Sequence, residues 1–196
     1  MTKNYSVVSY LSGEDFKEVR DIQKELVKLT GSQKCLVDWL PHLTVGTGIT
    51  LDDDQLSRVD DLFKEVANKT SGFKIKAEGF GGWDDWKGQI DGKITSYVIY
   101  LKVEVNDELQ NLFNSLKKEV TDNFEVWLPR IEEYKPHITL AFADLDEVGY
   151  RKGLEYVNSL QDFSLDIDIE HFSLTECYGV GNMESVEHKR YSLKED

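Results

Sequence analysis

Cysteine is scarce in this chain: only Cys35 and Cys177 occur among 196 residues. Two cysteines are too few for a disulfide framework, and these two lack the spacing of a zinc site. Apolar runs of membrane-spanning length are also missing, and the first residues do not form a signal-peptide pattern. These absences lead us to expect a protein of the reducing cytoplasm, with no membrane partner and no metal.

Positive charge is scarce as well. The chain has 23 Lys and Arg residues against 37 Asp and Glu residues, a formal net charge of −14. Binding along a duplex needs many cationic contacts with phosphates, so long nucleic acids are disfavoured as partners. A small nucleotide, or one RNA end held by a few donors, remains compatible with this charge. With 40% hydrophobic residues, the chain should fold into an ordered structure, and we expect a monomer.

One short pattern occurs twice. Residues 39–45 and 134–140 both read aromatic, any residue, Pro, His, aliphatic, Thr, aliphatic, and they lie 95 positions apart. In the second copy Ile138 and Leu140 alternate with His137 and Thr139, which is the period of a strand with one buried face. The histidine and the threonine of each copy should therefore point to the same side of a strand.

The elements predicted around the two copies also repeat. Each half reads strand, helix, His–Thr strand, helix, strand. In the first half these elements are expected at 5–11, 16–29, 42–45, 51–68 and 73–80. In the second half they are expected at 97–103, 109–116, 137–140, 144–160 and 163–169, with further strands at 171–178 and around 191–193.

This repetition predicts an α+β fold. We expect a single bilobal domain over 1–196, built from approximate repeats 1–92 and 93–196. The two similar lobes would be related by a pseudo-two-fold axis, each an antiparallel sheet with helices on the outside. The axis would bring the two His–Thr strands together across a central cleft between the sheets.

Two imidazoles and two hydroxyls in one small space suit a phosphodiester. Thr44 and Thr139 can donate hydrogen bonds to the phosphate, while His42 and His137 act as general acid and base. Imidazole suits both roles because its unperturbed pKa is about 6.5. Such a pair needs no metal or other cofactor. The same histidines can instead be metal ligands, which inactivation by EDTA would reveal.

The doubled His-x-Thr-x pattern resembles the 2H phosphoesterase superfamily, which includes the LigT-like "2′-5′ RNA ligase" proteins and the cyclic phosphodiesterases. The motifs that carry the resemblance are 42–45 and 137–140, and it extends over nearly the whole chain. It implies a two-lobed fold and hydrolysis of 2′,3′-cyclic, other cyclic or 2′-5′-linked phosphodiesters. It also implies that His42 and His137 are the acid–base pair and that the two threonines bind phosphate. LigT-like proteins often carry Arg where this chain has Phe142, which makes RNA ligation less expected than hydrolysis.

Four further residues are candidates for substrate binding. Trp39 and Tyr134 can stack on a base or pack the core, and Lys135 and Arg130 can contact phosphate or remain ordinary surface charges. Trp83 and Trp86 can cover a nucleotide or pack a hairpin. The alternative to an enzyme is a module on the same fold that binds a nucleotide or an RNA end without turning it over.

Overall fold

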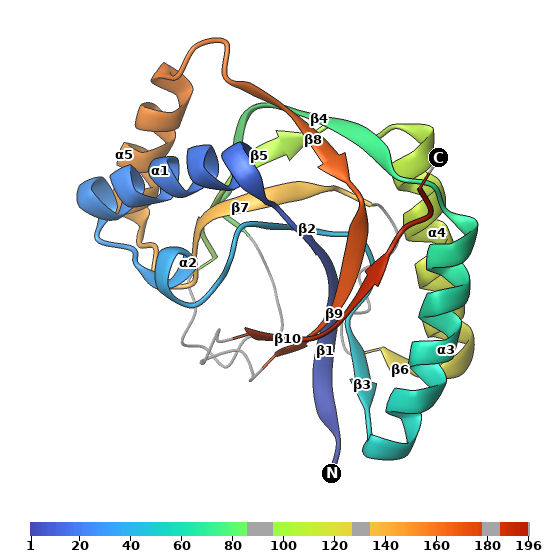
Figure 1. The fold of residues 1–196 in the computed structure, drawn as a ribbon. Helices are drawn as coiled ribbons and strands as arrows, with labels where there is room; N and C mark the ends of the chain where they lie inside the picture. The colour runs from blue at the N-terminus through green and yellow to red at the C-terminus, as the bar shows by residue number, and fades with distance from the viewer. Residues whose placement is uncertain (86–95, 127–133, 178–184, 196) are drawn as a thin grey trace.

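The computed structural model describes residues 1–85, 96–126, 134–177 and 185–195 (Figure 1). The strands in this part are β1 (Lys3–Tyr10), β2 (His42–Thr44), β3 (Ile49–Leu51), β4 (Phe73–Trp83), β5 (Val98–Val103), β6 (Glu125–Val126), β7 (His137–Phe142), β8 (Ser164–Ile169), β9 (His171–Cys177) and β10 (Ser185–Ser192). The helices are α1 (Gly13–Thr30), α2 (Lys34–Val37), α3 (Asp53–Lys69), α4 (Asp107–Asn123) and α5 (Glu147–Ser159). No described helix has the length and apolar character needed to cross a membrane.

Local sequence explains where the long helices begin and end. The Asp52 side chain accepts a hydrogen bond from the Gln55 amide, and the Gln55 side chain bonds back to the Asp52 amide, which forms a complete capping box at α3. At α4 and α5 the Asn106 and Asp146 side chains accept a hydrogen bond from the amides of Leu109 and Gly149. Helix α1 ends at Thr30 and is capped by Gly31, whose φ of 79° is left-handed and favours glycine.

The strands form one antiparallel sheet, in which neighbouring strands are often not consecutive in the sequence. The order is β10-β9-β1-β2-β7-β5-β4-β8, with β3 pairing to β1 and β6. The two His–Thr strands, β2 and β7, are neighbours in the middle and pair through Leu43 and Ile138. The α+β class and the antiparallel lobes are confirmed. The structure adds that the two lobes are joined directly by this pairing.

Helices cover the two lobes separately. Helices α3 and α4 lie along the β1–β9–β10 side, where the Phe63 ring meets Phe172 edge-on at 5.6 Å. Helices α1 and α5 lie against the β7–β5–β4 side, where Gly153 lets Leu26 and Ile99 approach its backbone closely. Figure 1 shows the two helix pairs at opposite sides of the sheet.

The lobes do not coincide with the two halves of the sequence. Strand β4, from the first half, pairs with β5 and β8, and strand β9, from the second half, pairs with β1. Each half therefore contributes strands to the lobe built around the other half. Because of this exchange, the central strands β2 and β7 are flanked on both sides by strands from both halves of the chain. Such a setting favours a rigid support for any chemistry at β2 and β7.

Candidate active site

Pairing of β2 with β7 brings the two motifs side by side. Leu43 and Ile138 are Cα partners, and they are also the equivalent residues of the two copies. Continuing this antiparallel register by one residue in each direction places His42 opposite Thr139, and His137 opposite Thr44. Both central aliphatic side chains are fully buried, while the four polar side chains are partly accessible. The four motif side chains therefore share one face, as the alternation predicted.

The two imidazoles are held in the same way. Nδ1 of His42 donates to the Leu40 carbonyl at 2.8 Å, and Nδ1 of His137 donates to the Lys135 carbonyl at 2.8 Å. A carbonyl oxygen can only accept, so the neutral form of each ring carries its proton on Nδ1. Each Nε2 is then the atom that can take or give a proton. This matched orientation suits a general acid and a general base.

Burial and proximity both affect how these rings titrate. Burial lowers the pKa of His42, the hydrogen bond to Leu40 opposes this change, and the neighbouring His137 lowers the pKa further. Burial also lowers the pKa of His137, against the hydrogen bond to Lys135. A charge on one ring therefore disfavours a charge on the other, and the pair should titrate as a coupled unit.

Side chains from outside the strands hold the backbone of both threonines. The Tyr134 hydroxyl donates to the Thr44 carbonyl at 2.8 Å, and the buried Gln23 amide donates to the Thr139 carbonyl at 3.2 Å. Arg20 in turn donates to the Gln23 side chain at 3.0 Å. Each half of the chain thus supports the motif strand of the other half.

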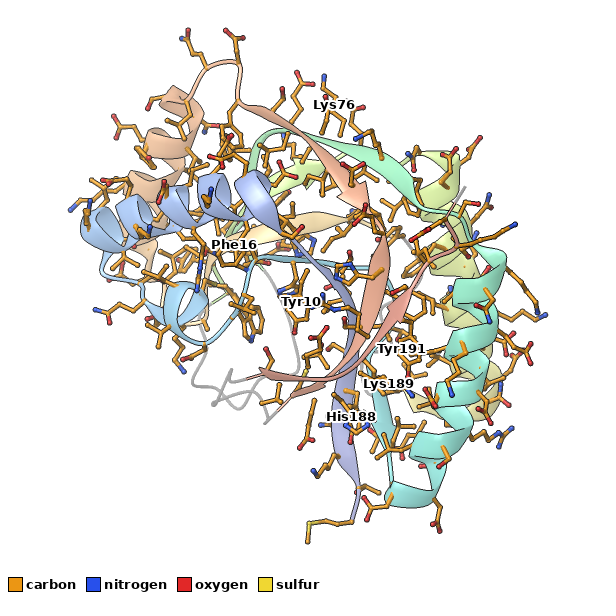
Figure 2. All side chains as sticks on the ribbon, in the orientation of Figure 1. Tyr10, Phe16, Lys76, His188, Lys189 and Tyr191 are labelled. Carbon is orange, nitrogen blue, oxygen red and sulfur yellow. The ribbon has the colours of Figure 1, made fainter. Side chains whose placement is uncertain are left out.

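Aromatic rings flank each histidine. His42 has edge-on contacts with Trp39 at 5.5 Å and with Tyr10 at 6.1 Å. His137 has edge-on contacts with Trp83 at 4.8 Å and with Tyr100 at 5.4 Å. In Figure 2, Tyr10 lies on the side of β1 that faces away from α3. These rings limit the movement of the imidazoles and leave the motif face bordered by aromatic surface.

Phe142 occupies an apolar cluster close to this face. It is 6% exposed, packs with Cys35 and Val98, and its ring lies 6.1 Å from that of Trp39. Trp83 packs against the same cluster. The position where LigT-like proteins often carry Arg is thus part of a small hydrophobic core that supports tryptophans next to both histidines.

The structure gives the four predicted substrate-binding residues different settings. Trp39 lies beside His42, and Lys135 is exposed and close enough to Tyr100 to affect its titration. Tyr134 stacks on Phe113 with a centroid distance of 3.9 Å and uses its hydroxyl on Thr44, which gives it a supporting position. Arg130, like Trp86, lies outside the described residues.

Sequence reasoning missed several residues of this face. Tyr10 and Lys102 are the Cα partners of His42 and His137, so their side chains share the motif face. Tyr100, on the same strand as Lys102, reaches His137. In the sequence, these residues belong to the alternating pattern of the first strand in each half. That pattern shows which side chains share a face, but only the pairing register shows that they lie beside the histidines. Gln23 had a clearer signal, since it is a polar residue on the apolar stripe of α1.

Two other observations bear on alternative sites. The described residues contain no group of three or more His, Cys, Asp or Glu side chains arranged to hold a metal ion. A groove of about 750 Å³ lies between α3, α4 and the start of β4, and it shares no residue with the histidine face. The motif face is therefore the candidate active site.

Comparisons with known proteins identify the family of the chain. Residues 47–177 match the family model described as the 2′-5′ RNA ligase superfamily, a range that includes the second motif and begins after the first. A "putative phosphoesterase" of Geobacillus kaustophilus is 25% identical over 87% of this chain and 94% of its own length. Another protein of that name, from Staphylococcus haemolyticus, is 32% identical over 64% of this chain and 70% of its own length.

Solved structures show the same fold. The crystal structure of Escherichia coli LigT complexed with 3′-AMP superposes with a TM-score of 0.65, covering 99% of both chains at 15% sequence identity. At that identity the likeness concerns the fold. Because the superposition covers 99% of this chain, the two-lobed arrangement is common to both proteins.

Proposed function

Because the chain belongs to the 2′-5′ RNA ligase superfamily, we propose that it is a phosphodiesterase that hydrolyses a small cyclic or 2′-5′-linked nucleotide. The substrate class includes 2′,3′-cyclic phosphates at RNA ends. The observation that carries the proposal is the matched orientation of His42 and His137, each with Nδ1 bonded to a carbonyl and both on one face of the paired strands. The phosphoesterase names of the relatives and the nucleotide bound to LigT support the same class.

The reaction follows from the four motif side chains. The hydroxyls of Thr44 and Thr139 donate to the non-bridging oxygens and hold the phosphate between the two strands. One neutral imidazole takes a proton from water as the water oxygen bonds to phosphorus. The other imidazole, protonated, gives its proton to the ribose oxygen as the phosphorus–oxygen bond to that oxygen breaks. Proton exchange with solvent then restores both rings.

The test is turnover of 2′,3′-cyclic nucleotides and 2′-5′-linked dinucleotides in the presence of EDTA. We expect hydrolysis that EDTA leaves unchanged and that His42→Ala or His137→Ala lowers by at least about a hundredfold, the usual contribution of one general acid or base. His188→Ala is a matched control, because His188 packs against Tyr5 on β1 and makes no contact with either motif.

Other outcomes distinguish other functions. Nucleotide binding without any product would identify a binding module. The apolar setting of Phe142 is compatible with this alternative, because the position lacks the arginine that LigT-like proteins often carry there. Loss of turnover in EDTA, restored by a divalent cation, would identify the histidines as metal ligands. Either result would overturn the proposed hydrolysis mechanism.

A further inference from the structure

The strands that flank the motif pair present unlike side chains beside the two histidines. Tyr10 on β1 is the Cα partner of His42, and Lys102 on β5 is the Cα partner of His137. The Tyr10 hydroxyl is engaged with Thr175 at 3.0 Å. Lys102 is exposed and has no ion-pair partner among the described residues. Of these two described partners of the histidines, the cationic one therefore lies on the His137 side.

The position of Lys102 decides what it can reach. Directly opposite residues of an antiparallel pair have Cβ atoms about 5 Å apart, so Lys102 and His137 are neighbours on the same face. Strand β5 lies on the side of β7 that is remote from β2. Lys102 is consequently beside the set of four motif side chains and not between the two histidines. An anion that it binds is adjacent to the reacting phosphate, on the β5 side.

The β5–β4 side also offers an aromatic surface. The rings of Trp83 and Tyr100 lie 4.3 Å apart. Gly81 makes room for this arrangement, because a Cβ atom at that position would come within 2.6 Å of the Tyr100 ring. Both rings contact His137. A cation and two aromatic rings on one side of a histidine match the phosphate and the base of a nucleotide.

The other end of the sheet, formed by β9 and β10, is built differently. Arg190 on β10 is the Cα partner of Ser173 on β9. Its guanidinium donates to the Glu187 carboxylate at 2.8 and 3.2 Å, and Ser173 donates to the same carboxylate at 2.5 Å. The charge of Arg190 is thus largely neutralised by a partner. Lys102 is the better site for an incoming phosphate.

We propose that Lys102 binds a second phosphate of the substrate, one nucleotide unit from the phosphate held by His42 and His137. The nucleoside between the two phosphates then lies over β5 and β4. The substrate class narrows to nucleotides that carry two phosphates, such as the terminal nucleotide of an RNA chain or a 5′-phosphorylated cyclic nucleotide. This inference rests on the proposed function for the location of the first phosphate.

The test compares two ligands by calorimetry, which needs no turnover. 3′-AMP carries one phosphate, and adenosine 3′,5′-bisphosphate carries a second. We expect the bisphosphate to bind about tenfold more tightly, as one charge-assisted contact provides. In Lys102→Met this ratio should fall close to one, and Lys102→Arg should keep most of it. The slope of log affinity for the bisphosphate against log salt should become shallower by about 0.7 to 1 in Lys102→Met.

Two variants serve as matched controls. Lys152→Met removes an exposed lysine from α5, and Arg190→Met removes the cation of the opposite side. Both should keep the affinity ratio of the unaltered protein. An equal loss in Lys152→Met would assign the effect to net charge, and a loss in Arg190→Met alone would place the second phosphate over β10. Either result would overturn the proposal, as would equal affinity of the unaltered protein for the two ligands.

These outcomes separate the inference from the proposed function. A Lys102-dependent preference for the bisphosphate, without hydrolysis of cyclic nucleotides, would support the second phosphate site and refute the phosphodiesterase. Hydrolysis that depends on both histidines, with equal binding of the two ligands, would refute only the second phosphate site.

Discussion

The hydroxyl of Tyr134 donates a hydrogen bond of 2.8 Å to the main-chain carbonyl of Thr44, a residue 90 positions earlier in the chain. The Tyr134 ring is fixed at the same time by stacking on Phe113 at an angle of 10°. Burial raises the pKa of the Tyr134 phenol, so the hydroxyl keeps its proton and remains a donor throughout the neutral range. A residue beside the second motif thereby positions the backbone of the first.

Tyr134→Phe should therefore impair catalysis more than folding. The substitution keeps the stacked ring and removes one hydrogen bond, which costs about 1 kcal/mol of unfolding free energy. We expect kcat to fall about tenfold while KM changes little, because Thr44 loses its fixed position relative to the phosphate. Steady-state kinetics and urea unfolding on the same preparation measure the two effects.

The matched control for Tyr134→Phe is Tyr156→Phe. Tyr156 on α5 is also partly buried, and its hydroxyl has no hydrogen bond within the described part of the chain. This variant should retain full kcat. If Tyr134→Phe also retained full kcat and lost only stability, the hydrogen bond to Thr44 would have no role in positioning.

Gln23 performs the corresponding task for Thr139 from helix α1, and it also accepts a hydrogen bond from Arg20. It is 2% exposed, so Gln23→Met, which keeps the length of the side chain, removes the buried donor to the Thr139 carbonyl and leaves Arg20 only the Cys35 and Trp39 carbonyls as acceptors. We expect a loss of about 1–3 kcal/mol of unfolding free energy, together with reduced kcat. Urea unfolding and steady-state kinetics provide the measurement.

Gln110→Met on α4 is a suitable comparison for Gln23→Met, because the Gln110 amide bonds only an exposed asparagine on its own helix. It should change the unfolding free energy by less than about 0.5 kcal/mol. Comparable losses in the two variants would show that the bond from Gln23 to Thr139 carries no special weight.

The buried histidines also predict how stability depends on pH. The pKa values of His42 and His137 are lowered in the folded protein, so the unfolded chain binds more protons below about pH 6.5. Stability should consequently decrease as the pH falls through about 6.5, and the decrease should end below the folded pKa values. Urea unfolding across this range measures the slope.

Replacing both histidines separates their effect from that of other groups. In the double variant His42→Gln, His137→Gln the slope between about pH 6.5 and 5.5 should become shallower, while the slope near pH 4 stays. Glu187 contributes only at the lower pH: burial raises its pKa, but the hydrogen bonds from Arg190 and Ser173 outweigh burial and hold the pKa below the ordinary value. An unchanged slope near pH 6 would contradict the burial of the two imidazoles.

How far the sequence predicted this site depends on the range of the interactions. Alternation within each motif was sufficient to place His137 and Thr139 on one face, since it is a property of a single strand. The short strands β3 and β6 were missed because three and two residues are too few for a period to show. Lys102 and Tyr10 required the register of neighbouring strands, which is set by the packing of the whole sheet.

The strand exchange between the lobes was beyond sequence reasoning for a similar reason. Matching elements predicted two similar lobes, but a repeated order of elements is equally compatible with each half forming its own lobe. The pairing of β4 with β5, and of β9 with β1, is decided by long-range contacts. Tyr134 was a candidate for stacking on a base or for packing in the core, and its hydrogen bond to Thr44 depends on those same long-range contacts.

Phe142 provides the last prediction. It stands where LigT-like proteins often carry Arg, so Phe142→Arg would appear to restore a cation for the phosphate. The Phe142 ring, however, packs with Cys35 and Val98 in a cluster from which solvent is largely excluded. Burial in this cluster also raises the pKa of the Cys35 thiol, which keeps it uncharged and offers an arginine no anionic partner there.

We therefore expect Phe142→Arg to lose about 2–4 kcal/mol of unfolding free energy and to gain no activity, because an unpaired buried charge is costly and the supports of Trp39 and Trp83 are disturbed. Phe142→Leu, which keeps the site apolar, should lose only about 1 kcal/mol. Urea unfolding and kcat/KM for a cyclic nucleotide measure both variants. An arginine variant as stable as the unaltered protein and faster in turnover would show that this position still faces the phosphate.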